Sequence, residues 1–130
     1  GQYKKVMIAR GLTQEPKMLM LDEPMSNLDI NHQVQVMKLL RKLTRTKNIS
    51  VLAICHDLNI AARYADRIIM LAKERIYASG TANEIINVKN INTVYGVDCR
   101  IIENEGRPYV IILAGLDEYD EFKQSNFIKI

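Results

Sequence analysis

The sequence of 130 residues contains no tryptophan, only three prolines and only two cysteines, Cys55 and Cys99. Two distant cysteines without a CxxC spacing indicate no disulfide framework and fit a reducing cytoplasm. Nothing resembles a signal peptide, and no apolar stretch approaches the roughly 18–20 residues that a membrane-spanning helix needs. We therefore expect any association with a membrane to come through a partner.

Aromatic residues are also scarce, at 6% of the chain, and this affects how the charge is interpreted. Residues 1–50 hold nine Lys or Arg and four Asp or Glu, a net charge of +5, whereas residues 51–130 hold nine and eleven, a net charge of −2. A basic cluster lies at the end of an expected helix, where cations complement the helix dipole: Arg41, Lys42, Arg45 and Lys47. A nucleic-acid surface is the alternative, but no aromatic side chains lie between these cations to stack on bases. We therefore expect no nucleic-acid partner.

The most informative segment is residues 17–29, KMLMLDEPMSNLD. Its apolar run, residues 18–21, is typical of a strand buried on both faces in a parallel sheet. Asp22 and Glu23 follow at the edge where open α/β sheets bind ligands. Two carboxylates there suit a division of roles, one near a Mg²⁺ ion and the other free to polarise a water. The alternative is a solvated loop start with a helix cap, because short motifs also occur by chance.

A second apolar run ends in a similar way. Residues 51–55, VLAIC, lead directly into His56 and Asp57. Two buried strands joined by one amphipathic helix form a βαβ unit, whose strands end at the same edge of the sheet. We therefore expect His56 to lie close to Asp22 and Glu23. A metal site formed by residues 55–57 is not expected, because adjacent strand residues cannot all face one ion.

The whole pattern predicts an α/β fold, with a partial parallel sheet, flanking helices and small β-hairpins. Strands are expected at residues 17–21 and 50–55, and hairpins at 67–79 and 99–113. Helices are expected at residues 2–14, 31–44, 57–65 and 89–95, with a further short helix after a capping box at residues 81–84. Residues 1–115 form part of one domain in this scheme. Residues 116–130 form an acidic tail that we expect to be loosely held.

Around the acid pair at residues 22–23 and around His56, the sequence resembles the carboxyl-terminal half of an ABC-type ATPase subunit, a member of the P-loop NTPases. The LDEP sequence at residues 21–24 resembles the Walker B motif with its following glutamate, and SNLD at residues 26–29 resembles the D-loop. His56 matches the switch histidine, and Gly1 and Gln2 match the last two positions of the LSGGQ signature. These segments occur in the family's order and spacing, and the resemblance extends to about Val110.

The resemblance implies a role for each residue. Glu23 is the implied general base for the attacking water, and His56 the implied sensor of the γ-phosphate. Asp22 is implied to hold the Mg²⁺ that bridges the terminal phosphates of ATP. A second ATPase subunit is implied in a head-to-tail homodimer, and the nucleotide-binding residues at its seam are Gly1, Gln2 and Asp29.

Residues 70–86 resemble the hairpin and helix that follow the switch histidine in importer ATPases. Residues 94–98, with the strand, glycine turn and Pro108 that follow, resemble the branch that takes up iron–siderophore, haem and cobalamin complexes, and residues 26–33 are similar to that branch too. The resemblance implies a subunit that hydrolyses ATP to power a membrane-spanning permease, which holds it at the cytoplasmic face of the cell membrane. One alternative is a non-transport ATPase of the same superfamily, of the chromosome-maintenance or DNA-repair type. Another is a catalytically inactive interaction fragment.

The sequence also departs from the family pattern, because it contains no G-x-x-x-x-G-K-[ST] loop. In the family this phosphate-binding loop precedes the signature. We therefore expect the full-length parent to be the active ATPase and the 130-residue chain alone to be inactive.

Overall fold

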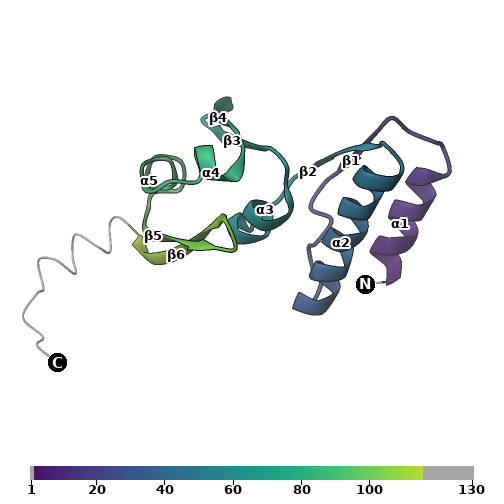
Figure 1. Cartoon of the computed structure of the whole chain (residues 1–130), viewed down its shortest axis with the longest axis horizontal. Coiled ribbons are helices and arrows are strands. Elements are labelled where there is room, and N and C mark those ends of the chain that lie inside the picture. Colours follow the sequence, from purple (N-terminus) through teal and green to yellow (C-terminus); the bar gives the residue numbers. More distant parts are fainter. Residues whose placement is uncertain (1, 116–130) are drawn as a thin grey trace, which may run out of the picture. The chain divides into compact units, whose positions relative to one another are not determined.

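The computed structural model describes residues 2–115 (Figure 1). Gly1 and the expected acidic tail, residues 116–130, lie outside the described residues. The chain divides into two units, Gly1–Asp57 and Leu58–Ile130. The fold is α/β as predicted, with a parallel strand pair, helices and two β-hairpins. None of the helices in residues 2–115 is both long and apolar enough to span a bilayer.

The first unit contains the predicted βαβ arrangement. Its elements are helix α1 (Gln2–Leu12), strand β1 (Met18–Leu21), helix α2 (Ile30–Thr46) and strand β2 (Ser50–Ala53). The strands pair in parallel, with Leu21 opposite Ala53. Helices α1 and α2 lie side by side (Figure 1), and Lys5 Nζ of α1 donates to Gln35 Oε1 of α2 at 2.6 Å.

The core of this unit comes from alternate or helically spaced apolar residues. Val36, Leu40 and Leu43 recur at spacings of four and three along α2, so they form one buried face of the helix. Ile8 of α1 and Leu19 of β1 are also buried. A Cβ added at Gly11 would lie 3.1 Å from Leu19 Cδ1, so the glycine allows α1 to approach β1 closely.

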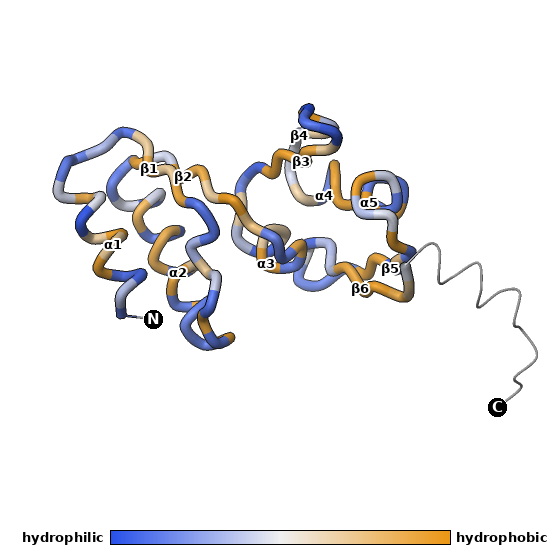
Figure 2. The backbone as a smooth tube through the Cα atoms, turned by 180° about the vertical axis from the view of Figure 1, so that it is seen from behind, coloured by the Kyte–Doolittle hydropathy of each residue, from blue (hydrophilic) through white to orange (hydrophobic). Residues whose placement is uncertain are grey.

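The prediction that the first strand is buried on both faces was wrong. Met18 and Met20 are 55% and 71% exposed, whereas Leu19 between them is buried. Successive side chains of a strand point to opposite faces, and no described residue covers the face that carries the two methionines. Leu52, which lies opposite Met20 in β2, is exposed on the same face. Figure 2 shows the apolar character of both strands.

Within residues 58–115 the second unit contains three helices and two hairpins, at the positions expected from the sequence. The helices are α3 (Leu58–Tyr64), α4 (Ala82–Ile85) and α5 (Val88–Tyr95), and the strands are β3 (Ile68–Ala72), β4 (Arg75–Gly80), β5 (Val97–Asn104) and β6 (Arg107–Gly115). The capping box at residues 81–84 is confirmed, since the Thr81 backbone N–H donates to Glu84 Oε2 at 2.6 Å. Gly96 ends α5 with a φ of 65°, a left-handed conformation that glycine adopts readily.

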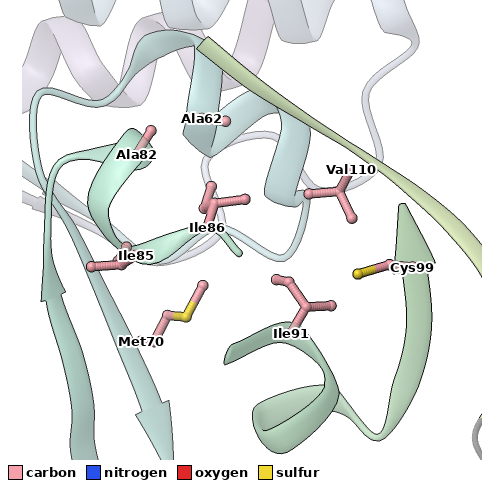
Figure 3. Close-up of a cluster of buried hydrophobic side chains, with 8 residues drawn as sticks. All are labelled: Ala62, Met70, Ala82, Ile85, Ile86, Ile91, Cys99 and Val110. Atoms are coloured by element: carbon pink, nitrogen blue, oxygen red, sulfur yellow. The ribbon is translucent and has the colours of Figure 1, made fainter. Parts of the chain in front are cut away.

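One apolar cluster holds these elements together (Figure 3). Its buried members are Ala62, Met70, Ala82, Ile85, Ile86, Ile91, Cys99 and Val110. Two polar side chains fasten α3 to β6. The Asn59 amide accepts from the Val110 N–H at 2.7 Å and donates to the Val110 carbonyl at 3.0 Å, as a neighbouring strand would. Arg107 Nη1 donates to the Ala62 and Ala65 carbonyls near the end of the helix.

Truncating the side chain at the centre of this cluster should greatly reduce the stability of the fold. Ile91 has 0% exposure, so Ile91→Ala should lower the free energy of unfolding by about 2–5 kcal/mol, through lost burial and an unfilled cavity. Urea unfolding followed by circular dichroism measures the change. Val88→Ala is the control on the same helix, because Val88 is 41% exposed and should cost much less. Equal losses for the two variants would contradict this assignment of the core.

Candidate catalytic site

Strand β1 ends in a tight turn that carries the acid pair. Glu23 and Asn27 have φ values of 45° and 60°, in the left-handed region that residues with a side chain seldom adopt. The Ser26 N–H donates to the Glu23 carbonyl at 3.1 Å and closes the turn. Pro24 and Met25, the two central residues of this turn, are buried. The turn is therefore anchored in the core of the first unit.

The pairing of β1 with β2 brings His56 to this turn, as the sequence predicts. The Ile54 N–H donates to the Leu21 carbonyl at 3.0 Å, so the segments that follow β1 and β2 still run side by side where the strands end. Two residues later, His56 Nε2 lies 2.7 Å from Glu23 Oε1. The two side chains come from positions 33 residues apart in the sequence.

This contact is an open one, with the His56 and Glu23 side chains 74% and 46% exposed. An ionised carboxylate can only accept a hydrogen bond, so when Glu23 is ionised the His56 Nε2–H donates the hydrogen bond to Glu23 Oε1. A carboxylate that faces solvent and is oriented by an imidazole is suited to accept a proton from water. The arrangement can therefore perform general base chemistry.

Asp22 differs from its neighbour Glu23 in having no partner among residues 2–115. Its side chain is exposed, and it makes no hydrogen bond or ion pair with any residue of the described part of the chain. Within residues 2–115 no group of three or more His, Cys, Asp or Glu side chains could hold a metal ion by itself. Mg²⁺ is usually held by one or two carboxylates together with waters and substrate phosphates, so a single free carboxylate fits this ion.

The Asp29 carboxylate forms its hydrogen bonds within its own helix, α2. It caps the N-terminus of α2, where Oδ1 accepts from the His32 N–H at 2.8 Å and Oδ2 lies 2.7 Å from His32 Nδ1. These bonds from the backbone N–H and then from the imidazole of His32 hold the pKa of Asp29 below its usual value. The Gln33 amide donates to the Leu28 carbonyl at 3.1 Å, so the first turn of α2 braces the preceding loop.

The structure thus joins some of the candidate residues and not others. Glu23 and His56 are in contact, whereas no described contact links either of them to Gln2 or Asp29. Gln2 is exposed at the start of α1, and Gly1 lies outside the described residues.

Sequence reasoning missed Lys4, which reaches the same turn from α1. Its Nζ donates to the Glu23 carbonyl at 3.4 Å and to Ser26 Oγ at 3.3 Å. A lysine on a surface helix ordinarily has a solvated charge, so no pattern in the sequence distinguishes it.

The bonds around Asp29 predict an acid-dependent contribution to stability. Because folding lowers its pKa, the carboxylate stabilises the fold fully above its ordinary value of 3.8, and this contribution is lost as the pH falls through the folded-state pKa. In His32→Ala the backbone N–H remains and the imidazole is lost, so the pKa should move part of the way back towards 3.8. Carbon-detected NMR titration of the Asp29 carboxyl measures this shift.

Glu84 is the internal control for that titration. Its pKa is lowered by the Thr81 N–H and hydroxyl, in another part of the chain, and should not respond to the change at His32. An unchanged Asp29 titration in His32→Ala would show that the imidazole contact is absent in solution.

Comparison with known proteins reveals extensive similarity. No protein-family model matches the chain. An uncharacterized ABC transporter ATP-binding protein of Methanocaldococcus jannaschii is 48% identical over 85% of the chain and 43% of that relative. The ferric enterobactin transport ATP-binding protein of Escherichia coli is 41% identical over 88% of the chain and 43% of that relative. The hemin import ATP-binding protein of Hahella chejuensis is 44% identical, with corresponding shares of 86% and 47%.

Solved structures are similar in the same way. An inward-facing protein described as a metal-chelate type ABC transporter matches with a TM-score of 0.77 and 25% identity, over 86% of the chain and 46% of that structure. A dimeric ATP-binding cassette bound to ADP and phosphate matches with a TM-score of 0.56 and 32% identity, over 62% of the chain and 34% of that structure. The chain spans less than half the length of the curated relatives that it matches. Sequence and fold together show that the chain belongs to the family of ABC transporter ATP-binding proteins.

Proposed function

We propose that this chain is part of the ATP-hydrolysing subunit of an ABC importer, in which Glu23 and His56 form the catalytic pair. The observation that carries the proposal is their 2.7 Å contact at the carboxyl ends of two paired parallel strands. Open α/β sheets bind their ligands at such an edge. Membership of the ABC family supports ATP as the ligand.

In the proposed reaction Glu23 orients a water and accepts its proton. The water oxygen then bonds to the γ-phosphorus, the bond from that phosphorus to the bridging oxygen breaks, and ADP leaves with the electron pair. His56 Nε2–H can donate to a γ-phosphate oxygen. In the present contact the same N–H is directed at Glu23, so the nucleotide has to draw the imidazole away from the carboxylate before water can enter between them.

We assign the Mg²⁺ ligand to Asp22, whose carboxylate is exposed and has no partner among the described residues. The ion would neutralise charge on the terminal phosphates. Asp22 and Glu23 are adjacent, so the same turn would supply both the ligand and the base.

The proposed partners are a second ATPase subunit, in a head-to-tail homodimer, and a membrane-spanning permease. Gly1, Gln2 and Asp29 are assigned to the seam, where they would face the nucleotide of the other subunit. One structural neighbour is a dimeric ATP-binding cassette, which supports this arrangement. We place the subunit at the cytoplasmic face of the membrane, held there through the permease.

We propose that the transported cargo is an iron(III)–siderophore, haem or cobalamin complex. The names of several relatives support this group, because they are import or transport proteins for ferric enterobactin, hemin and petrobactin. The same names do not favour the non-transport ATPase of the chromosome-maintenance or DNA-repair type. Because the 130 residues contain no phosphate-binding loop, activity is best tested in a complete subunit that includes this chain.

Replacing the proposed base tests the catalytic role. In a complete subunit, Glu23→Gln should lower the rate of Mg-ATP hydrolysis by about 10²–10⁴-fold while nucleotide remains bound, since the amide keeps the shape but cannot accept the proton. Phosphate release and retention of labelled ATP are the measurements. Glu74→Gln is the matched control on an exposed turn and should hydrolyse ATP like the wild type. Near-normal phosphate release by Glu23→Gln would remove Glu23 from this role.

Replacing Asp22 tests the metal assignment separately. Asp22→Asn should raise the Mg²⁺ concentration for half-maximal activity by roughly 10–100-fold, because the amide oxygen binds a hard cation more weakly than a carboxylate does. A Mg²⁺ titration of ATP hydrolysis at fixed ATP measures this change. A fall in maximal rate with an unchanged Mg²⁺ requirement would place Asp22 outside the metal site.

A further inference from the structure

Lys4 makes an unusual set of contacts for a helix lysine. Its half-buried side chain leaves α1 and reaches the turn after β1, where Nζ lies 3.4 Å from the Glu23 carbonyl oxygen and 3.3 Å from Ser26 Oγ. It forms no ion pair with a described acidic side chain. The ammonium group is therefore directed at a backbone carbonyl and a hydroxyl of a single turn.

The carbonyl that Lys4 contacts belongs to a residue in a disfavoured conformation. Glu23 has a φ of 45°, which non-glycine residues maintain only when surrounding contacts hold them there. Its carbonyl accepts from the Ser26 N–H as well as from Lys4, and its carboxylate accepts from His56. Both ends of the residue are thus fixed, the carboxylate by the imidazole and the backbone by the turn and the lysine.

The next residue on the helix shows that this contact is specific to position 4. Lys5 has the same charge and is also half-buried, but its Nζ donates to Gln35 Oε1 of α2 at 2.6 Å. The two lysines therefore fasten α1 to different parts of the first unit, one to the turn that carries the proposed base and the other to a helix.

We propose that Lys4 is a positioning residue for Glu23. By holding the Glu23 carbonyl and Ser26 Oγ, it keeps the turn in the left-handed conformation that directs the carboxylate towards His56. It also connects the helix that begins at Gln2 to the backbone of the base. The catalytic part of this inference rests on the proposed function, whereas the conformational part does not.

The test uses a complete subunit that contains this chain, in three variants: Lys4→Met, Lys4→Arg and Lys5→Met. Methionine keeps the length of the stem and removes the donors, so Lys4→Met should raise the amide hydrogen-exchange rate of Ser26 at least about fivefold, by loosening the turn. It should also lower kcat for ATP hydrolysis by about tenfold and leave KM for ATP within about twofold, because the base is misdirected rather than the nucleotide released. Lys4→Arg restores a donor and should recover most of the rate.

Lys5→Met is the matched control, since it removes the same charge one residue away and breaks the contact with α2 instead. It should leave both Ser26 exchange and kcat close to the wild type. Thermal unfolding of all the variants identifies any general loss of stability. The proposal would be overturned if the Ser26 amide of Lys4→Met exchanged at the wild-type rate, or if Lys4→Met and Lys5→Met had equal effects.

A failure of the proposed catalytic role of Glu23 can be distinguished from a failure of the positioning role of Lys4. If Glu23→Gln hydrolyses ATP normally, the proposed function of Glu23 is wrong, and Ser26 exchange still decides whether Lys4 holds the turn. If Ser26 exchange rises in Lys4→Met but kcat is unchanged, Lys4 stabilises the turn without positioning the base, and the proposal is overturned.

Discussion

The parallel pairing of β1 with β2 is the constraint on which the candidate site depends. Backbone hydrogen bonds join the two strands and continue with the bond from the Ile54 N–H to the Leu21 carbonyl. They fix the point at which each strand leaves the sheet. Glu23 and His56 leave at the same edge and meet there. A contact between two exposed side chains contributes little stability by itself, because it is screened by solvent and costs side-chain entropy. The strand pairing, rather than the contact itself, fixes the relative positions of Glu23 and His56.

The second unit is organised differently, by an apolar cluster with a few polar fasteners. Asn59 bonds to both backbone groups of Val110, and Arg107 satisfies carbonyls near the end of α3. Helix termini leave such carbonyls without partners inside the helix. The arginine therefore joins two elements and at the same time satisfies groups that would be costly to bury.

Local chemistry made much of this structure predictable. The capping box at residues 81–84 and both hairpins follow from short signals whose physical causes lie within a few residues. The approach of His56 to Glu23 followed from a longer rule, that parallel strands joined by a helix end at the same edge. The exposure of Met18 and Met20 could not be predicted, since an apolar run does not reveal which faces other layers cover. Neither could the contact of Lys4 with the turn, which depends on the direction of a flexible side chain.

The left-handed backbone of Glu23 restricts which amino acids position 23 can accept. Glycine and asparagine would relax this conformation, but neither carries a carboxylate. Aspartate tolerates it better than glutamate, but its carboxylate would stop one methylene short of the imidazole. The left-handed backbone and the need for a carboxylate that reaches His56 therefore favour different residues. Glutamate provides the carboxylate but adopts the left-handed conformation less readily.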